Sequence, residues 1–193
     1  HGHHRRQRQM CIRDRTLGLN VTVIEMASRI LERVTSPTIS SFYNSFHESK
    51  GVNILTSTSV KGINGDKKVS SVETSLGTID ADIVIVGIGV LPCQSLAEDS
   101  GIEVDNGIIV DEFCKTSDDN IFSAGYCTLH PSKFYNKNIR LESVHNAIEQ
   151  GKTVASSIIG EKIAYNQIPW FWSDQYELKL QIAGLNNDYD HHI

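Results

Sequence analysis

The stretch Gly18–Arg29 reads GLNVTVIEMASR and decides the fold class, because it joins a β-rich run to an acidic residue. Val21 and Val23 sit in a short run of β-branched residues, which predicts a buried strand with Glu25 at its carboxyl end. Ser36-Pro37 then predicts the start of a helix, since Ser is a favoured N-cap and Pro a favoured first-turn residue. A strand followed by a helix is the pattern of an α/β fold.

The residues after Ser36 continue this pattern. The predicted helix ends at Lys50-Gly51 and places its apolar residues on one face: Ile39, Phe42 and Phe46. Two β-rich runs, 52–60 and 68–75, predict a small meander around a turn at Gly65-Asp66. Residues 81–89, ADIVIVGIG, form a near-continuous apolar run, which predicts a strand buried on both faces.

A second α/β unit is predicted after Pro92. We expect a short helix up to Ser100, strands at 107–110 and 121–124, and a long helix over 143–160. This long helix carries one apolar stripe that should pack on the sheet: Val144, Ala147, Ile148, Gly151, Ala155, Ile158 and Ile159. Residues 169–185 are rich in aromatic residues and then alternate strictly between apolar and polar residues, which predicts the start of a separate antiparallel sheet domain.

Composition excludes several classes of protein. The net charge is -5, and residues 1–15 carry five of the arginines, so the remaining 13 basic and 22 acidic residues give -9. Such an acidic body argues against a nucleic-acid surface. The longest apolar run is far shorter than a membrane span. The four cysteines show neither a CxxC motif nor metal-ligand spacing, which favours a reducing cytoplasm and predicts no metal site.

Residues 1–15, HGHHRRQRQMCIRDR, lack apolar periodicity and the hydrophobic core of a signal peptide. They resemble the translated adapter remnants found at the ends of assembled environmental sequences. We therefore expect a non-native leader, with a basic arm or a His-rich metal tag as the alternative.

Two features are typical of a nucleotide site. A carboxylate at the end of the second strand of a Rossmann unit can accept both ribose hydroxyls of NAD and repels a 2′-phosphate, and Glu25 has this position. Gly87 and Gly89 follow an apolar run and fit a turn where the backbone approaches a ligand. Taken singly, Glu25 is equally a solvated residue and the glycines a plain turn. The phosphate-binding GxGxxG loop, expected about 20 residues before Glu25, does not occur, so we expect this chain to be part of a longer protein.

Three strings are the most specific features of the sequence: TSDDNIFSAGYC (116–127), RLESVHNAIEQG (140–151) and PWFWSDQ (169–175). In this order and spacing they resemble the FAD-dependent ferredoxin reductases that supply electrons to oxygenases and cytochromes P450. The resemblance extends from about Thr16 to the end of the chain. It implies a Rossmann-like FAD/NAD(P)-binding α/β fold, followed by the start of a C-terminal α+β interface domain.

The resemblance also implies a division into domains. Residues 16–89 are similar to the second half of the NAD domain, residues 90–163 to the second FAD segment, and residues 164–193 to the beginning of the interface domain.

Four predicted cofactor-binding positions follow from the resemblance. The family string ends in Ala-Gly-Asp, whose carboxylate accepts a hydrogen bond from the ribityl chain of FAD; here Gly125 is retained and Tyr126 replaces the Asp. A phenol is bulkier and is not an anionic acceptor, so either flavin binding is weakened or Tyr126 reflects a one-base misreading of an Asp codon. Val144 would present the backbone of a helix N-terminus to the flavin, and Trp172 would lie beside its ring system.

Each of these positions also has a plainer interpretation. Glu142 is a further polar candidate near the flavin and equally a first-turn helix carboxylate. Val144 is equally helix core, and Trp172 without the resemblance is a packing anchor.

The implied reaction passes electrons from NADH through FAD to a ferredoxin-type [2Fe-2S] protein, with the cofactor supplying the chemistry and no catalytic side chain. A related NADH oxidase, nitrite reductase or disulfide reductase is one alternative. A catalytically silent nucleotide-binding fragment, suggested by Tyr126, is another.

Overall fold

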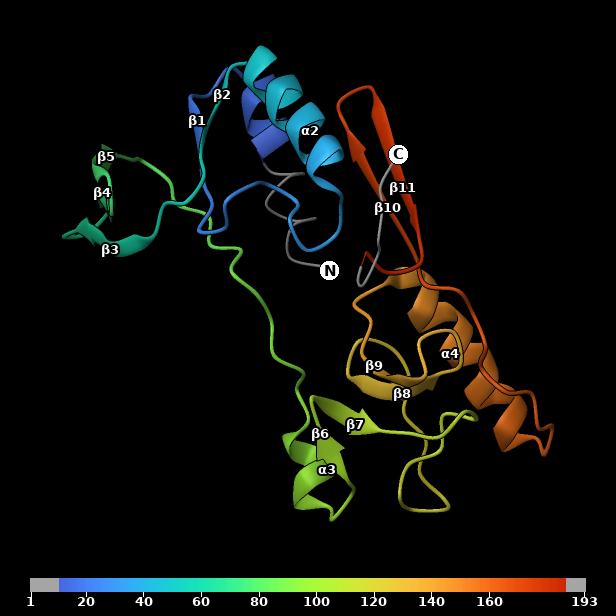
Figure 1. Ribbon diagram of the computed structural model, residues 1–193. Helices are drawn as coiled ribbons and strands as arrows, with labels where there is room; N and C mark the ends of the chain where they lie inside the picture. The colour runs from blue at the N-terminus through green and yellow to red at the C-terminus, as the bar shows by residue number, and fades with distance from the viewer. Residues whose placement is uncertain (1–10, 187–193) are drawn as a thin grey trace. The chain divides into compact units, whose positions relative to one another are not determined.

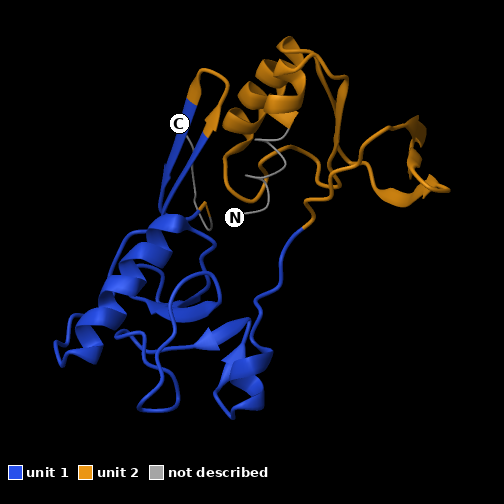
Figure 2. Ribbon diagram, turned by 180° about the vertical axis from the view of Figure 1, so that it is seen from behind, with its two compact units in different colours: residues 1–2, 89–173, 179–185 blue, residues 3–88, 174–178, 186–193 orange. Residues whose placement is uncertain are grey.

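The computed structural model describes residues 11–186, which form two compact units. Of these residues, 11–88, 174–178 and 186 belong to one unit, and 89–173 and 179–185 to the other (Figures 1 and 2). In the described part of the predicted leader, residues 11–15 are helical, and Arg15 Nε donates a hydrogen bond of 2.9 Å to the Lys50 carbonyl. Residues 1–10 of that leader lie outside the described range.

The first unit contains a β-α-β arrangement. Strand β1 (Val21–Ile24) pairs in parallel with β2 (Val52–Leu55), and helix α2 (Pro37–Ser49) connects them. Ser36 is the N-cap of α2 and its hydroxyl accepts from the Ile39 N–H at 3.5 Å, which satisfies a first-turn donor. The predicted strand, helix and cap are confirmed.

Helix α2 does not bury the face that its phenylalanines mark. Its buried residues are Ser40, Tyr43 and His47, whereas Phe42 is 52% exposed. His47 Nε2 and Gln175 Oε1 form a buried hydrogen bond of 2.7 Å. The buried face of this helix is therefore defined by hydrogen-bonding residues as much as by apolar ones.

A three-stranded antiparallel meander follows, made of β3 (Val60–Gly65), β4 (Val69–Thr74) and β5 (Gly77–Asp80). The predicted meander is therefore partly wrong. Residues 52–55 join the parallel sheet as β2, and β5, which was not predicted, supplies the outer strand.

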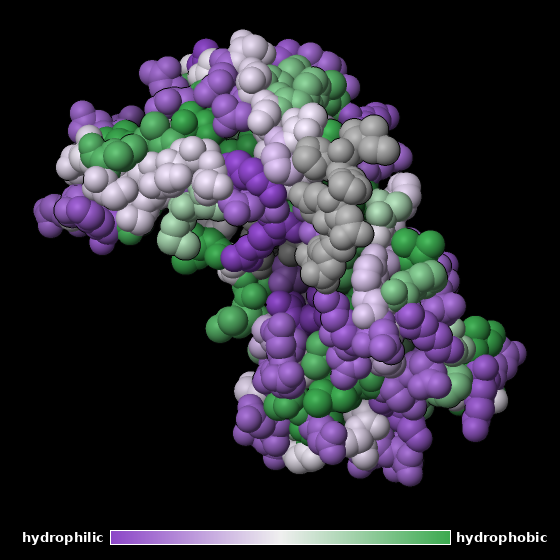
Figure 3. Space-filling view, viewed as in Figure 1, coloured by the Kyte–Doolittle hydropathy of each residue, from purple (hydrophilic) through white to green (hydrophobic). Residues whose placement is uncertain are grey.

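The predicted buried strand over residues 81–89 does not form. These residues have no regular secondary structure, and most of the large apolar residues of 83–91 are exposed, including Ile83 at 72%, Ile88 at 87% and Leu91 at 91%. A strand needs a neighbour for its N–H and C=O groups, and within residues 11–186 the parallel sheet consists of β1 and β2 alone. Apolar side chains consequently reach the surface, where Figure 3 shows hydrophobic patches between polar ones.

The second unit begins with α3 (Ser95–Asp99) and contains a four-stranded sheet, in the order β6 (Val104–Asp105), β7 (Gly107–Ile109), β8 (Thr128–Ser132) and β9 (Lys137–Ile139). Strands β7 and β8 are parallel, and the other two pairings are antiparallel. The short helix and the strand from residue 107 are confirmed. The strand predicted over 121–124 is wrong: only a single bridge, between Lys115 and Phe122, forms across a tight turn.

Helix α4 (Val144–Ile158) is confirmed, with Ser143 as its N-cap. The face it was expected to bury is wrong. Its buried residues are Asn146, Gln150 and Thr153, whereas the predicted stripe is largely exposed, with Ile148 at 53% and Ile158 at 66%. Asn146 and Gln150 hydrogen-bond to residues of β8 and of the adjacent loops, and no described element covers the apolar stripe.

Strands β10 (Trp170–Gln175) and β11 (Leu178–Ala183) form a two-stranded hairpin. The side chains of β11 alternate between half-buried and exposed, which confirms the predicted alternation. No helix among residues 11–186 has the length and hydrophobicity needed to cross a membrane.

Two glycines of β3 make a matched test of the meander. Gly65 has φ +155°, and a Cβ there would overlap the Lys68 carbonyl, whereas a Cβ at Gly62 would meet only side-chain atoms at 3.9 Å. We expect Gly65→Ala to lower the free energy of unfolding by about 2 kcal/mol and Gly62→Ala by less than about 1 kcal/mol. Urea unfolding of both variants measures the difference, and equal losses would contradict the proposed strain.

Candidate functional site

The predicted site residues are divided between the two units. Glu25 and Gly87 belong to the unit with the parallel sheet. The remaining residues belong to the unit that contains α4: Gly89, Gly125, Tyr126, Glu142, Val144 and Trp172.

Glu25 lies directly after β1 and is held in place by its own loop. Its N–H donates to the Leu55 carbonyl at 2.9 Å, which extends the parallel pairing by one residue. Its Oε1 accepts from the Ala27 N–H at 2.9 Å. The carboxylate is therefore oriented at the carboxyl end of the strand, the edge where parallel sheets bind nucleotides.

Arg29 organises the loop after Glu25, a role that strand periodicity did not reveal. Its Nη1 donates to the Thr35 carbonyl at 2.8 Å and to Ser40 Oγ at 2.6 Å, and its Nη2 donates to the Glu32 carbonyl at 3.1 Å. Three of the five guanidinium N–H groups thus bond to this loop and to the start of α2, so Arg29 supports the loop.

Gly87 and Gly89 lie in the irregular stretch after β5. Gly89 has φ +138°, a conformation that favours glycine, and a Cβ there would meet no atom within 4 Å. Backbone conformation, and not close packing, therefore accounts for Gly89 in this structure.

Gly125 and Tyr126 form a turn that precedes β8. Gly125 has φ +95°, and its buried N–H donates to Gln150 Oε1 at 2.7 Å. The Tyr126 side chain is 40% exposed. The peptide backbone of this turn is thus fixed, while the side chain of Tyr126 reaches solvent.

Arg140 connects this turn to Glu142 and was not predicted from the sequence. Its Nη1 donates to the Tyr126 carbonyl at 3.2 Å and forms an ion pair with Glu142 Oε1 at 3.0 Å. The Glu142 side chain is only 6% exposed, so its negative charge requires such a partner. Glycine at position 107 leaves room for this arrangement, because a Cβ there would lie 3.1 Å from Arg140 Cδ and 2.8 Å from the Cys127 carbonyl oxygen.

Val144 is the first residue of α4 and is 38% exposed. The Ser143 hydroxyl accepts from the Asn146 N–H at 3.4 Å and donates to the Trp170 carbonyl at 2.7 Å. The helix start is thereby joined to β10, the strand that carries the half-buried Trp172. The N–H groups of a first helical turn have no acceptor within the helix and favour an electron-rich ligand.

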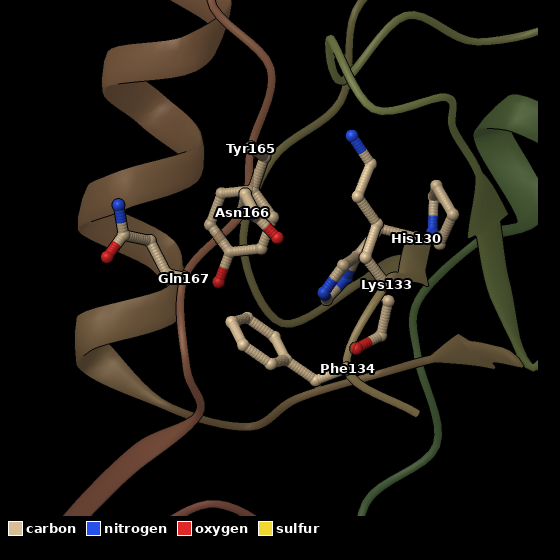
Figure 4. A pocket seen from close by; sticks show the side chains of 8 residues that line it. His130, Lys133, Phe134, Tyr165, Asn166 and Gln167 are labelled. Carbon is tan, nitrogen blue, oxygen red and sulfur yellow. The ribbon is translucent and has the colours of Figure 1, made fainter. Parts of the chain in front are cut away.

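A buried polar network lies behind the Gly125 turn. Gln150 Nε2 and His130 Nδ1 are 3.0 Å apart, and the ring of Tyr165 meets the His130 ring edge-on, with centroids 5.0 Å apart. His130 Nε2 has no hydrogen-bond partner among the described residues, and the ring lines a small hollow with Lys133, Phe134 and Tyr165 (Figure 4). Burial lowers the pKa of His130 to about 4.

The sequence strings at 116–127 and 140–151 and most of the string at 169–175 therefore meet within one unit. Hydrogen bonds and an ion pair join the Gly125 turn to Glu142 and to α4, and Ser143 joins the start of α4 to β10. Tyr126 and Val144 are both exposed here, and the N–H groups of the first turn of α4 could face the electron-rich edge of a flavin. The sequence signal for the missed Arg140 was its spacing of two residues from Glu142, which puts both side chains on one side of an extended segment.

His130 makes the protein sensitive to mild acid. An unfolded histidine has a pKa of about 6.5, so the unfolded state takes up the proton first as the pH falls. The contribution of neutral His130 to the free energy of unfolding is therefore fully present above about pH 6.5 and is lost as the pH falls toward 4. We expect a loss of about 2 kcal/mol between pH 7 and pH 5.

Urea unfolding at the two pH values measures this loss. His130→Asn is the matched variant, because its Oδ1 can still accept from Gln150 but cannot titrate. An equal acid-dependent loss in the variant and the wild type would show that other groups are responsible.

Comparison with known proteins adds an independent line of evidence. The relatives include rhodocoxin reductase of Rhodococcus erythropolis, 44% identical over 181 residues, with 93% of this chain and 42% of the relative covered. Putidaredoxin reductase of Pseudomonas putida is 43% identical over 176 residues, with coverage of 89% and 42%. The chain thus spans less than half the length of these relatives.

Solved structures of related reductases match the fold of this chain. The ferredoxin reductase for the CYP199A2 system of Rhodopseudomonas palustris matches with a TM-score of 0.92 and 37% identity, covering 95% of this chain and 46% of that one. The covalent putidaredoxin reductase–putidaredoxin complex matches with a TM-score of 0.91 and 39% identity, covering 95% and 45%. These likenesses confirm the predicted resemblance and the Rossmann-like fold class.

Two family matches cover most of the sequence. Residues 170–193 match the reductase C-terminal family, which includes the hairpin of β10 and β11. Residues 9–151 match the pyridine nucleotide-disulphide oxidoreductase family, and they include β1, Glu25, the Gly125 turn and most of α4. The chain belongs to the pyridine nucleotide-disulphide oxidoreductase family.

Proposed function

We propose that this chain is part of a flavoprotein reductase that passes electrons from NADH through FAD to a ferredoxin-type [2Fe-2S] protein. The observation that carries the proposal is the cluster formed by the Gly125 turn, Glu142 and the N-terminus of α4. Relatives named rhodocoxin reductase and putidaredoxin reductase support it, and one matched structure is a complex with putidaredoxin.

Residues of the α4 unit would hold FAD. The first-turn N–H groups at Val144 would face the electron-rich edge of the ring system, and Tyr126 would meet the ribityl chain where the related reductases have an Asp. Trp172 would pack beside the ring. When bound, FAD supplies the acceptance of a hydride and the release of single electrons, so the chain itself needs to bind, orient and exclude water.

Glu25 would bind the adenosine ribose of NADH. Its carboxylate is already oriented by the Ala27 N–H, and two ribose hydroxyls can donate to it. A 2′-phosphate would be repelled by this carboxylate, and three of the five N–H donors of Arg29 are already used within the protein, which leaves fewer for such a phosphate. These two features favour NADH over NADPH, and Gly87 and Gly89 would lie near the same ligand.

The domain division supports this function. We propose that residues 16–89 belong to the NAD domain, residues 90–163 to the FAD domain and residues 164–193 to the interface domain, with the cytoplasm as the location. The division of the described chain into compact units between residues 88 and 89 supports the first boundary.

The alternative reactions have weaker support. A disulfide reductase of the dithiol type uses a CxxC pair, which residues 1–193 lack, and Cys114 is fully buried with a pKa that burial raises to about 12, so its thiol stays protonated. A water-forming NADH oxidase is 19% identical and supports the fold alone. Tyr126 favours a silent nucleotide-binding module as the second candidate, since the related reductases have a carboxylate there.

Tyr126→Asp separates these two candidates. The complete open reading frame that contains this chain is expressed in both forms, and bound flavin is read from the visible spectrum. We expect the variant to bind FAD about tenfold more tightly, because a carboxylate accepts a stronger hydrogen bond than a phenol. Since Tyr126 is 40% exposed, little packing is lost.

Tyr126→Asn is the neutral control and should gain less. A yellow wild type bleached by NADH would support an active reductase that tolerates Tyr126. A colourless protein in all three forms would rule out the flavoprotein assignment.

Glu25→Gln tests the nicotinamide preference. Loss of the charge should raise the KM for NADH and lower the KM for NADPH, which reduces the preference for NADH by about tenfold. Glu32→Gln, in the same loop, is the control and should leave both constants unchanged. Steady-state kinetics with each nucleotide provide the measurement, and an unchanged ratio in Glu25→Gln would remove Glu25 from the site.

A further inference from the structure

Gln150 is a fully buried side chain at the centre of the polar face of α4. Buried amides are retained only where their donors and acceptors are satisfied, because an unpaired one costs about 1–3 kcal/mol. The contacts of Gln150 therefore indicate what the residue does.

The acceptor of this amide serves the Gly125 turn. Gln150 Oε1 accepts from the Gly125 N–H at 2.7 Å, and a backbone N–H can only donate, so the oxygen must be the atom on this side. The Thr128 hydroxyl lies 2.8 Å from the same oxygen and 2.9 Å from the Gly125 carbonyl, and its single proton is shared between them.

The donor of the amide then faces His130. With Oε1 committed to Gly125, Nε2 donates to His130 Nδ1 at 3.0 Å, so Nδ1 is the acceptor and the proton of the neutral ring lies on Nε2. Asn146 completes the network: its Nδ2 donates to Gln150 Oε1 at 3.3 Å, and its Oδ1 accepts from the Tyr165 hydroxyl at 2.7 Å.

The Gly125 turn is thus held at two successive positions by side chains from outside it. Gln150 fixes the Gly125 N–H, and Arg140 fixes the Tyr126 carbonyl. The two side chains that contact the turn from either end lie in α4 and in the segment just before it. The position of Tyr126 is thereby tied to the helix whose N-terminus belongs to the same candidate site.

We propose that Gln150 is a positioning residue for FAD, which holds the Gly125–Tyr126 turn in register with the N-terminus of α4. This inference rests on the proposed function. Gln150 acts through the Gly125 N–H, and its removal leaves that buried N–H without its acceptor while Arg140 still bonds the Tyr126 carbonyl.

The test compares two substitutions in the complete open reading frame. Gln150→Leu keeps the approximate size but removes both polar atoms. Gln150→Glu keeps the acceptor for Gly125 and Thr128, and a proton held between its buried carboxyl and His130 Nδ1 restores the remaining hydrogen bond without an unpaired charge. Lys152→Gln is the control on the same helix, because its exposed ammonium pairs only with Glu149 at 2.6 Å among the described contacts.

Apoprotein is titrated with FAD, the thermal midpoint of each apoprotein is recorded, and amide hydrogen exchange is followed over residues 121–128. We expect Gln150→Leu to raise the Kd for FAD by about tenfold and to speed exchange at Gly125, since one buried hydrogen bond is lost. The Kd of Gln150→Glu for FAD should stay within about threefold of the wild-type value, and the Kd of Lys152→Gln should equal the wild-type value.

A purely structural role would give a different result. If Gln150→Leu lowers the thermal midpoint but leaves the Kd for FAD within about threefold of wild type, the positioning role is wrong. Wild-type protein that binds no FAD would overturn the proposed function and the positioning of FAD with it. Exchange at Gly125 would then still show whether Gln150 holds the turn.

Discussion

Helix α4 packs against its unit through polar side chains, and the requirement that each of these be hydrogen-bonded governs the surrounding loops. Gln150 satisfies the Gly125 N–H, and Asn146 satisfies the Tyr165 hydroxyl. An apolar helix face tolerates sliding against its neighbours, but such a network accepts only one register, because a shift would leave several buried groups unpaired. The geometry of the candidate site follows from that single register.

The two units differ in how they support function. Around Glu25 the backbone itself positions the carboxylate, through β1 pairing with β2 and the N–H of Ala27. Around Gly125, side chains from other segments position the turn, with Arg140 as a partly buried cation between the turn and Glu142. A nucleotide ribose needs one well-placed acceptor, whereas a flavin ring needs several elements aligned over a larger area. The denser hydrogen-bond network around Gly125 is consistent with this larger binding surface.

Local signals in the sequence predicted much of this structure. The Ser36 cap, the strand before Glu25 and the alternation in β11 depend on neighbouring residues, and all are confirmed. The strand predicted over residues 81–89 was wrong because a strand needs a neighbouring strand to pair with, and sequence periodicity does not show whether one is present. Gln150 and Arg140 were missed for a similar reason: their contacts lie 25 and 14 residues away in the sequence, and only the fold brings them together.

The exposed run at 83–91 also bears on how the chain resists aggregation. Its β-branched residues and unpaired backbone are the composition of an intermolecular aggregation nucleus. Asp80 and Asp82 precede the run and Pro92 ends it. Charge and proline at the two ends act as gatekeepers, since they oppose the stacking of one copy on another. The sequence therefore protects a segment that has no strand partner among the described residues.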